Sequence, residues 1–264
     1  METLILGVEL VVIILLVILG AAFGSFFNVI IYRVPRKESI VFPSSHCPHC
    51  GKAIPFWLNV PILSYLLLKG KCKYCGAGIH WHYFLVELLT PLVFLGVFFS
   101  LQSLGLLVVL KYLVFFGIGI CIFFIDAFHQ IIPDVLSLPL IIIGLIFSLF
   151  PGADISFQSS LVGGLVCFLF FLLLGLLYYG FRKKEGMGGG DVKLIAAVGT
   201  FFGFPDALFV IVLSAILAVV VILAFQKDKS KVFPYGPFII AAAMLHIVVG
   251  AHIMDAYLQM LSSL

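Results

Sequence analysis

Residues 104–125 read LGLLVVLKYLVFFGIGICIFFI, and Asp126 follows directly. A helix that crosses the hydrocarbon core of a bilayer needs about 20 mostly apolar residues. This segment has that length and contains one charged residue, Lys111, so it predicts a transmembrane helix. The Lys111 ammonium group is expected to extend outward to the membrane surface, as long basic side chains do.

The composition of the whole chain favours a membrane protein. Of its 264 residues, 63% are hydrophobic and 10% are charged, whereas about 25% of the residues of a soluble domain are charged. Similar apolar segments predict about eight transmembrane helices, at residues 4–31, 83–101, 104–125, 135–150, 160–179, 192–204, 207–225 and 237–258. The fourth and sixth are short, so either is expected to be tilted or re-entrant. The predicted fold class is an all-α polytopic membrane protein.

The basic residues predict how these helices are oriented. Thirteen of the 15 Lys and Arg lie in residues 33–73, 182–184 and 227–231. The cytoplasmic loops of membrane proteins carry an excess of Lys and Arg. We therefore expect these segments in the cytoplasm, where they also meet anionic lipid headgroups, and both termini outside. The net charge of +3 reflects this orientation rather than a nucleic-acid partner.

The first apolar segment is expected to remain in the protein as a transmembrane helix. It carries Glu2 and Glu9, whereas a cleaved signal peptide begins with basic residues and has a shorter apolar core. We divide the chain into this first helix at residues 1–34, a cytoplasmic zinc-binding loop domain at 35–82 and a transmembrane core at 83–264.

The loop domain contains two CxxC pairs, Cys47 with Cys50 and Cys72 with Cys75. Each pair can hold one edge of a tetrahedron, and four thiolates are typical of a structural zinc site. The loop has little hydrophobic surface of its own, so metal binding would supply folding free energy. Disulfides are the alternative, and a cytoplasmic location disfavours them because thiols stay reduced there. The spacing therefore predicts zinc or a similar metal.

Four other polar residues are interpreted as structural. Asn28 would be costly if unpaired in hydrocarbon, so it is expected to face protein, and Glu87 is expected to make a structural hydrogen bond. Cys121 and Cys167 lie within predicted helices and are interpreted as small apolar packing residues.

The sequence Gly186-Met187-Gly188-Gly189-Gly190-Asp191 places a carboxylate directly after a run of glycines. Glycine has no Cβ and allows backbone conformations closed to other residues, so this loop can bring Asp191 close to another helix. The alternative is that Asp191 only caps the helix that follows. Asp126 ends a predicted helix, where the helix dipole disfavours a negative charge, so its presence is hard to explain structurally.

The predicted orientation places Asp126 and Asp191 at the same membrane face, on different helices. Carboxylates near a bilayer are costly and mark functional sites. Two carboxylates that share a site hold one proton between them, so one can accept a proton from water while the other donates to a peptide carbonyl. The other acids are interpreted as structural or solvated: Asp134 follows Pro133 and suits a helix N-cap, and Asp154 and Asp206 lie in outer turns.

The chain resembles the bacterial type IV prepilin peptidases, which are GxGD aspartic proteases. The matching pieces occur in family order over nearly the whole chain. They are Gly24-Ser25-Phe26-Phe27-Asn28-Val29, the two CxxC pairs, Asn59-Val60-Pro61, Gly70-Lys71-Cys72, Asp126 with Pro133-Asp134, the segment from Gly186 to Lys193, and Tyr235-Gly236-Pro237-Phe238. Each piece is weak alone, and their combination is highly specific.

The resemblance implies that Asp126 and Asp191 are the catalytic pair. It implies an inner-membrane enzyme that cuts the leader of prepilins and pseudopilins after a glycine, at the cytoplasmic face. It also implies N-methylation of the new N-terminus with S-adenosylmethionine, for which Gly70 and Lys71 match the family's Gly-basic pair. The four-cysteine site would then be structural. No oligomeric state follows from these residues.

Three other classes of function remain as alternatives. Paired acids also serve proton relays, so an ion-coupled transporter with a structural zinc loop is one. A membrane thiol oxidoreductase would use a reactive CxxC pair. The third is a nonenzymatic scaffold of a pilus export machine.

Overall fold

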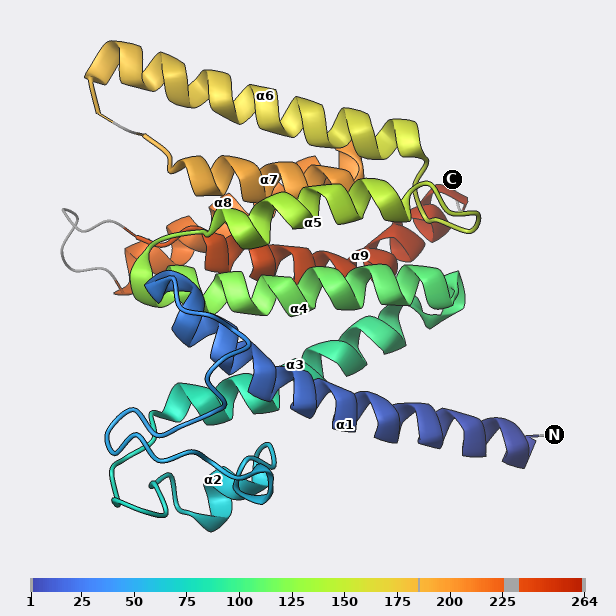
Figure 1. Cartoon of the computed structure of the whole chain (residues 1–264). Coiled ribbons are helices and arrows are strands. Elements are labelled where there is room, and N and C mark those ends of the chain that lie inside the picture. Colours follow the sequence, from blue (N-terminus) through green and yellow to red (C-terminus); the bar gives the residue numbers. More distant parts are fainter. Residues whose placement is uncertain (1, 185, 226–232, 263–264) are drawn as a thin grey trace. The chain divides into compact units, whose positions relative to one another are not determined.

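The computed structural model describes residues 2–184, 186–225 and 233–262, which Figure 1 shows as a ribbon. Within these ranges the regular structure is helical. Extended segments pair there only as two isolated bridges, His46 with Ala53 and Lys71 with Gly78. The predicted all-α fold class is confirmed.

Each of the eight predicted transmembrane segments overlaps one helix. These helices are α1 (Glu2–Arg33), α3 (Trp81–Leu101), α4 (Leu106–His129), α5 (Asp134–Phe147), α6 (Phe157–Arg182), α7 (Gly189–Phe202), α8 (Phe204–Phe225) and α9 (Gly236–Ser262). The remaining described helical segments are short, namely η1 (Val34–Arg36), η2 (Phe56–Leu58), α2 (Leu63–Leu67) and η3 (Gln102–Leu104).

Five described helices are long and apolar enough to cross a membrane, so this is a multi-pass membrane protein. They extend over Glu9–Arg36, Trp81–Leu104, Leu106–His129, Phe157–Arg182 and Phe204–Ala224. The apolar stretches Asp134–Phe147 and Gly236–Gly250 are shorter. Helices α5 and α7 have 14 residues each, in agreement with the short fourth and sixth segments.

The chain divides after Phe98 into two compact units. In the first unit, α1 and α3 approach each other closely at two glycines of α1. A Cβ on Gly20 would lie 2.6 Å from the Pro91 Cα, and one on Gly24 would lie 2.8 Å from the Glu87 Cα. Small residues allow this kind of backbone contact between membrane helices. The insert between α1 and α3 carries the four cysteines.

Helix α7 lies at the centre of the second unit, where it packs against α6, α5 and α8 (Figure 1). Every residue from Leu194 to Phe202 is buried, so this helix is covered by protein on all sides. A Cβ on Gly199 would collide with the carbonyl oxygen of Gly163, so glycine at this position brings α7 against α6. A helix that is apolar all round is typical of such an interior position.

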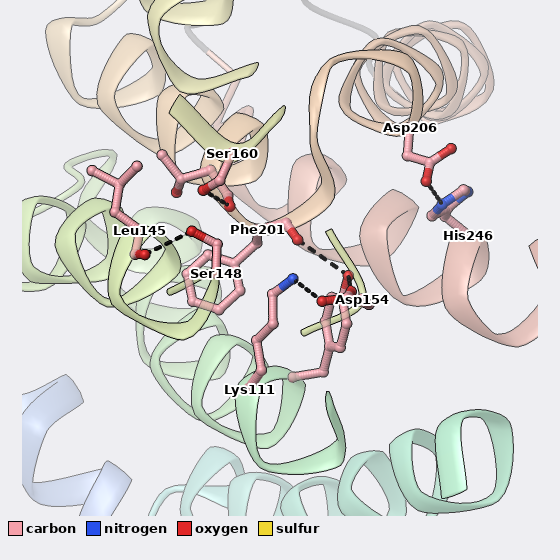
Figure 2. A network of polar contacts seen from close by, with 10 residues as sticks. Lys111, Leu145, Ser148, Asp154, Ser160, Phe201, Asp206 and His246 are labelled. Carbon is pink, nitrogen blue, oxygen red and sulfur yellow. Dashed lines mark hydrogen bonds and ion pairs between the residues drawn. The ribbon is translucent and has the colours of Figure 1, made fainter. Parts of the chain in front are cut away.

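A buried ion pair at one end of the second unit corrects two predictions (Figure 2). Lys111 is 1% exposed, and its Nζ atom lies 2.7 Å from Oδ1 of Asp154. Tyr112 donates a hydrogen bond to the other oxygen of Asp154, at 2.9 Å. The predictions that Lys111 extends to the membrane surface and that Asp154 is solvated were therefore wrong. The turn after α5 supplies the lysine with a counter-ion, so the ammonium group has no need to reach the headgroups.

The structural interpretations of Cys121, Cys167, Glu87 and Asp206 agree with the structure. Cys121 and Cys167 are buried residues of α4 and α6. Glu87 accepts a hydrogen bond from the backbone N–H of Ile62 at 2.7 Å. The Asp206 side chain is 55% exposed, and its carboxylate lies 3.9 Å from the ring of His246 (Figure 2).

Candidate active site

Asp126 lies in the last turn of α4 and is almost completely buried. Its Oδ2 atom accepts a hydrogen bond from the backbone N–H of Gly236, the first residue of α9, at 2.9 Å. The free N–H groups at a helix N-terminus carry partial positive charge and bind anions. A carboxylate that the dipole of α4 disfavours is thus stabilised by the beginning of α9.

Gly236 has a second role at this contact because it has no side chain. A Cβ at this position would lie 2.9 Å from the Asp126 carboxylate and 3.2 Å from the Ile132 side chain. Any larger residue would therefore move the carboxylate or the beginning of α9.

Asp191 is the third residue of α7, and the residue that caps this helix is Gly188. The alternative prediction that Asp191 is the N-cap is wrong. A Cβ on Gly190 would lie 2.8 Å from the Ile132 Cβ, so α7 begins in direct contact with the segment that follows α4. The glycine run brings Asp191 toward another helix, as predicted.

The run of glycines acts by its lack of side chains rather than by unusual backbone angles. Among the described residues from Gly186 to Gly190, none has a positive φ. A Cβ on Gly186 would lie 2.5 Å from the Tyr178 ring. Close approach of the chain is therefore what the glycines supply here.

The two carboxylates are near enough to influence each other. Asp191 precedes the apolar part of α7, and burial raises its pKa to about 6, with a further contribution from the charge of Asp126. A hydrogen bond with Gly188 opposes this rise. Like charges in one site cannot both ionise easily, so such a pair tends to hold one proton.

Tyr235 lies at the same site and was given no role from the sequence. Its hydroxyl is 2.6 Å from the hydroxyl of Ser214 on α8. Burial raises the pKa of Tyr235, and the charge of Asp191 also contributes. The sequence Tyr235-Gly236-Pro237 indicates that a helix begins here, because proline is common in the first turn of a helix. That signal could have drawn attention to Tyr235 and Gly236.

Asp134 and Lys193 form an ion pair between α5 and α7. The Lys193 Nζ atom lies 2.6 Å from Oδ1 of Asp134, and both side chains are partly exposed. The prediction that Asp134 is a helix N-cap is wrong, because Pro133 occupies that position and leaves Asp134 in the first turn. Lys193 is two residues from Asp191, so this pair joins the beginning of α7 to α5.

A second group of residues with functional chemistry lies in the first unit. The Sγ atoms of Cys47, Cys50, Cys72 and Cys75 all lie within 4.8 Å of one another. The four residues are free thiols, which disagrees with the disulfide alternative. Backbone N–H groups of Cys75 and Tyr74 lower the pKa of Cys72 to about 7, which favours the thiolate that binds metals.

The two CxxC pairs have nearly the same local fold. The Cys47 N–H donates to the Lys52 carbonyl at 3.0 Å, and the Cys72 N–H donates to the Ala77 carbonyl at 2.8 Å. Each pair is followed at once by a glycine with a positive φ, +67° at Gly51 and +71° at Gly76. This repeated tight turn presents two thiols from each hairpin to a common centre.

Gly70 and Lys71 precede the second hairpin. Gly70 has a φ of +65°, and a Cβ there would lie 3.0 Å from the Tyr65 hydroxyl. A side chain at this position would be strained and crowded at once. The side chain of Lys71 is exposed.

Comparisons with known proteins agree with the division into two units. The model of the Bacterial Peptidase A24 N-terminal domain matches residues 18–101, and that of the Type IV leader peptidase family matches residues 113–223. The chain is similar to proteins named Prepilin leader peptidase/N-methyltransferase. It is 36% identical to that of Dichelobacter nodosus over 260 residues, which cover 87% of this chain and 89% of the relative. For Pseudomonas aeruginosa the identity is 34% over 276 residues, with 92% of each chain covered. No solved structure matches.

Proposed function

Because this chain belongs to the type IV leader peptidase family, we propose that it is a membrane aspartic endopeptidase with Asp126 and Asp191 as its catalytic pair. It removes the leader peptide of type IV prepilins or pseudopilins and N-methylates the new N-terminus. The observation that carries the proposal is that the buried Asp126 of α4, held by the N–H of Gly236, lies near enough to the half-buried Asp191 of α7 for the two charges to interact.

The chemistry of the proposed pair requires one proton between the two carboxyl groups. The ionised group accepts a proton from water as the water oxygen attacks the peptide carbonyl carbon, and the protonated group donates its proton to the carbonyl oxygen. The tetrahedral intermediate then breaks its C–N bond as the leaving amine takes the proton that the first carboxylate accepted from water, and the hydroxyl that becomes the new carbonyl returns its proton to the second carboxylate. The raised pKa of Asp191 supports this proton sharing. The Gly236 N–H orients Asp126 by holding one of its oxygens.

We place the cut at the cytoplasmic face of the bacterial inner membrane. Both aspartates lie at helix ends, and α7 begins just after the basic residues Arg182, Lys183 and Lys184. Such basic segments stay in the cytoplasm. The comparisons lend no support to the transporter alternative.

Zinc is the metal that best fits the four cysteines. A tetrahedron with Zn–S bonds of about 2.3 Å separates its sulfur atoms by about 3.8 Å. The Cys47 and Cys75 sulfurs are 3.9 Å apart. Cys47, Cys50, Cys72 and Cys75 would hold the ion, which would cross-link the two hairpins of the insert and leave no position open for catalysis.

S-adenosylmethionine is the proposed methyl donor, and Gly70 and Lys71 are proposed to support methyl transfer. Substitution of Gly70, at its positive φ, should disturb the turn that leads into Cys72. Methyl transfer should then fall while proteolysis continues. Loss of both activities together would instead point to a purely structural role.

The deciding experiment is prepilin cleavage by purified full-length protein, with mass spectrometry of the product. The wild type should cut after the leader glycine, and Asp126→Asn and Asp191→Asn should lose activity by at least about 100-fold, as expected for a lost acid or base. Asp206→Asn makes the same change at an exposed acid in the first turn of α8 and should cut normally. Cleavage by Asp126→Asn but not by Asp134→Asn would show that the pair is misassigned.

A further inference from the structure

Helix α2, in the cysteine insert between α1 and α3, exposes an apolar face. Its residues Leu63, Leu66 and Leu67 are 57%, 56% and 81% exposed. Residues at i, i+3 and i+4 lie on one side of a helix, so the three leucines form a single row, which we call the leucine face. On a helix of a soluble domain, the side that faces water carries polar and charged residues instead.

The short helix η2, just before α2, adds two exposed aromatic side chains. Phe56 and Trp57 are both more than half exposed, and their rings meet edge to face with centroids 4.9 Å apart. Tryptophan is enriched where a membrane meets water, because its ring is apolar and its N–H is polar. Large apolar side chains gathered on a surface mark a site of interaction with a protein or a membrane.

Contacts with α3 set the depth of α2 in the membrane. Tyr65, two residues after Leu63 and so on the other side of α2, stacks on Phe84 with ring centroids 5.2 Å apart. The Ile62 N–H donates to the Glu87 carboxylate at 2.7 Å. Helix α3 begins at Trp81 and belongs to a candidate membrane span. At about 1.5 Å per residue, Phe84 and Glu87 lie about 5 Å and 9 Å inside its beginning. Helix α2 is therefore held beside the part of α3 that enters the membrane.

The backbone that leads into α2 is fixed in this position. Ile62 has φ +65° and ψ −55°, and the Leu63 N–H donates to the Pro61 carbonyl at 2.6 Å. This is a γ-turn with a positive φ, a rare and strained form, especially for a β-branched residue. Such a conformation persists only where the surroundings enforce it. Here the Glu87 carboxylate binds the N–H of the strained residue, so α2 stays against α3.

The charges of the insert are complementary to an anionic membrane surface. Residues 35–82 contain six Lys and Arg and a single acid, Glu38. Three of the lysines, Lys69, Lys71 and Lys73, follow α2 closely, and all are exposed. Lysine side chains extend over apolar surface to place their ammonium groups among lipid headgroups, and anionic lipids attract them. Apolar residues next to lysines are typical of a segment that lies in the membrane interface.

We infer that the leucine face of α2, together with Phe56 and Trp57, is buried in the lipid leaflet in which α3 begins, at the boundary between headgroups and acyl chains. Lipid is the occupant because α3 holds α2 at that depth and because lysines follow it. The insert is then a membrane-anchored domain rather than a loop in water. This anchorage does not depend on the proposed peptidase or methyl-transfer activity.

The chain has two tryptophans, Trp57 and Trp81, and they allow a direct test by fluorescence. Full-length protein is reconstituted into vesicles of phosphatidylcholine and phosphatidylglycerol whose acyl chains carry bromine either near the headgroup or near the methyl end. Trp81→Phe leaves Trp57 as the only tryptophan. Trp57→Phe leaves Trp81, the first residue of α3, as a reference for the depth of the membrane surface. Bromine near the headgroup should quench Trp57 as strongly as it quenches Trp81, and more strongly than bromine near the methyl end does.

Quenching of Trp81 by brominated lipid without quenching of Trp57 would overturn the inference. Acrylamide, which quenches from water, then shows what covers the surface in place of lipid. Strong quenching of Trp57 by acrylamide would show that η2 faces water. Weak quenching by both agents would show that protein covers it, either a second copy of this chain or another partner.

A pair of double variants, made in the Trp81→Phe protein, tests the leucine face itself. Leu63→Gln with Leu67→Gln should lower the quenching of Trp57 by lipid, because amide groups are costly among acyl chains. Leu104→Gln with Leu106→Gln makes the same change at two exposed leucines beyond the other end of α3 and should leave the quenching unchanged. Circular dichroism and gel filtration in detergent will show that both proteins are folded. Equal quenching in the two folded proteins would overturn the assignment of the leucine face to lipid.

Discussion

Asp126 and Gly236 are 110 residues apart in the sequence, yet they meet at one hydrogen bond. The backbone N–H that holds the carboxylate is free because it begins a helix, and the space for the carboxylate exists because the residue is glycine. Orientation of a proposed catalytic oxygen thus depends on the absence of a single methyl group.

Gly236→Ala should therefore reduce cleavage without unfolding the protein. The new Cβ would lie 2.9 Å from the Asp126 carboxylate, and a shift of about 1 Å in a reacting group can cost about 100-fold in rate. Measurement of kcat on a prepilin peptide will check this. Gly175→Ala on α6 adds the same methyl group where no atom lies within 4 Å, so it should leave kcat unchanged. Equal rates for both variants would contradict the proposed contact.

The pH dependence of cleavage should follow the proton that the pair shares. Because burial raises the pKa of Asp191 to about 6, this group keeps its proton below that pH and loses it above. We expect kcat/KM to decline as the pH rises through about 6 and to decline again in acid, where the pair takes up a second proton. These two limits belong to the coupled pair rather than to either residue. A flat profile from pH 5 to pH 8 would argue against proton sharing.

At the scale of elements, ion pairs join helices that are distant in sequence. Lys111 of α4 pairs with Asp154 in the turn between α5 and α6, with almost no exposure of the lysine (Figure 2). Lys193 of α7 pairs with Asp134 of α5 in a partly exposed position. Burial should make these two pairs very different in their contribution to stability.

Lys111→Met should lower the free energy of unfolding by about 3–5 kcal/mol, because it leaves the Asp154 charge without its partner. Lys193→Met, which breaks the more exposed pair, should cost about 1 kcal/mol or less. Denaturant unfolding in detergent micelles can compare the two variants. The double variant Lys111→Met, Asp154→Asn should be more stable than Lys111→Met alone, because it removes the unpaired charge. Equal stability of the two would contradict the proposed contribution of this ion pair.

At the scale of the whole molecule, the two proposed activities belong to different units. The first unit holds the four cysteines together with Gly70 and Lys71, and the second holds both aspartates. The two matched family models divide at a similar place in the chain. Changes confined to the insert are therefore expected to affect methyl transfer more than proteolysis.

Removal of the metal should separate the activities. Cys47→Ser, or treatment with a strong chelator, should remove bound zinc and loosen the two hairpins, because a structural metal supplies their folding free energy. Limited proteolysis should then cut within residues 44–80, methyl transfer should fall and prepilin cleavage should continue. Cys167→Ala changes a buried thiol of α6 and should retain zinc. Equal loss of both activities in Cys47→Ser would contradict this separation.

The sequence by itself determined the membrane class, the eight helical segments and the cysteine cluster. A long apolar run in hydrocarbon must satisfy its backbone hydrogen bonds internally, so its conformation can be read locally. The spacing within each CxxC pair likewise limits its geometry, and charge distribution indicated that Asp126 and Asp191 come from the same face. Family motifs along the chain then identified the chemistry.

Only the tertiary structure decided which polar groups meet. Lys111 was expected at the membrane surface and Asp154 in water, because the two residues that pair are far apart in the sequence. The same holds for Gly236 with Asp126, for Tyr235 with Ser214 and for Ile62 with Glu87. Apolar periodicity predicts that a helix will be buried, but it does not predict which helix will cover it. Long-range packing makes that choice, and it alone placed these hydrogen bonds and ion pairs.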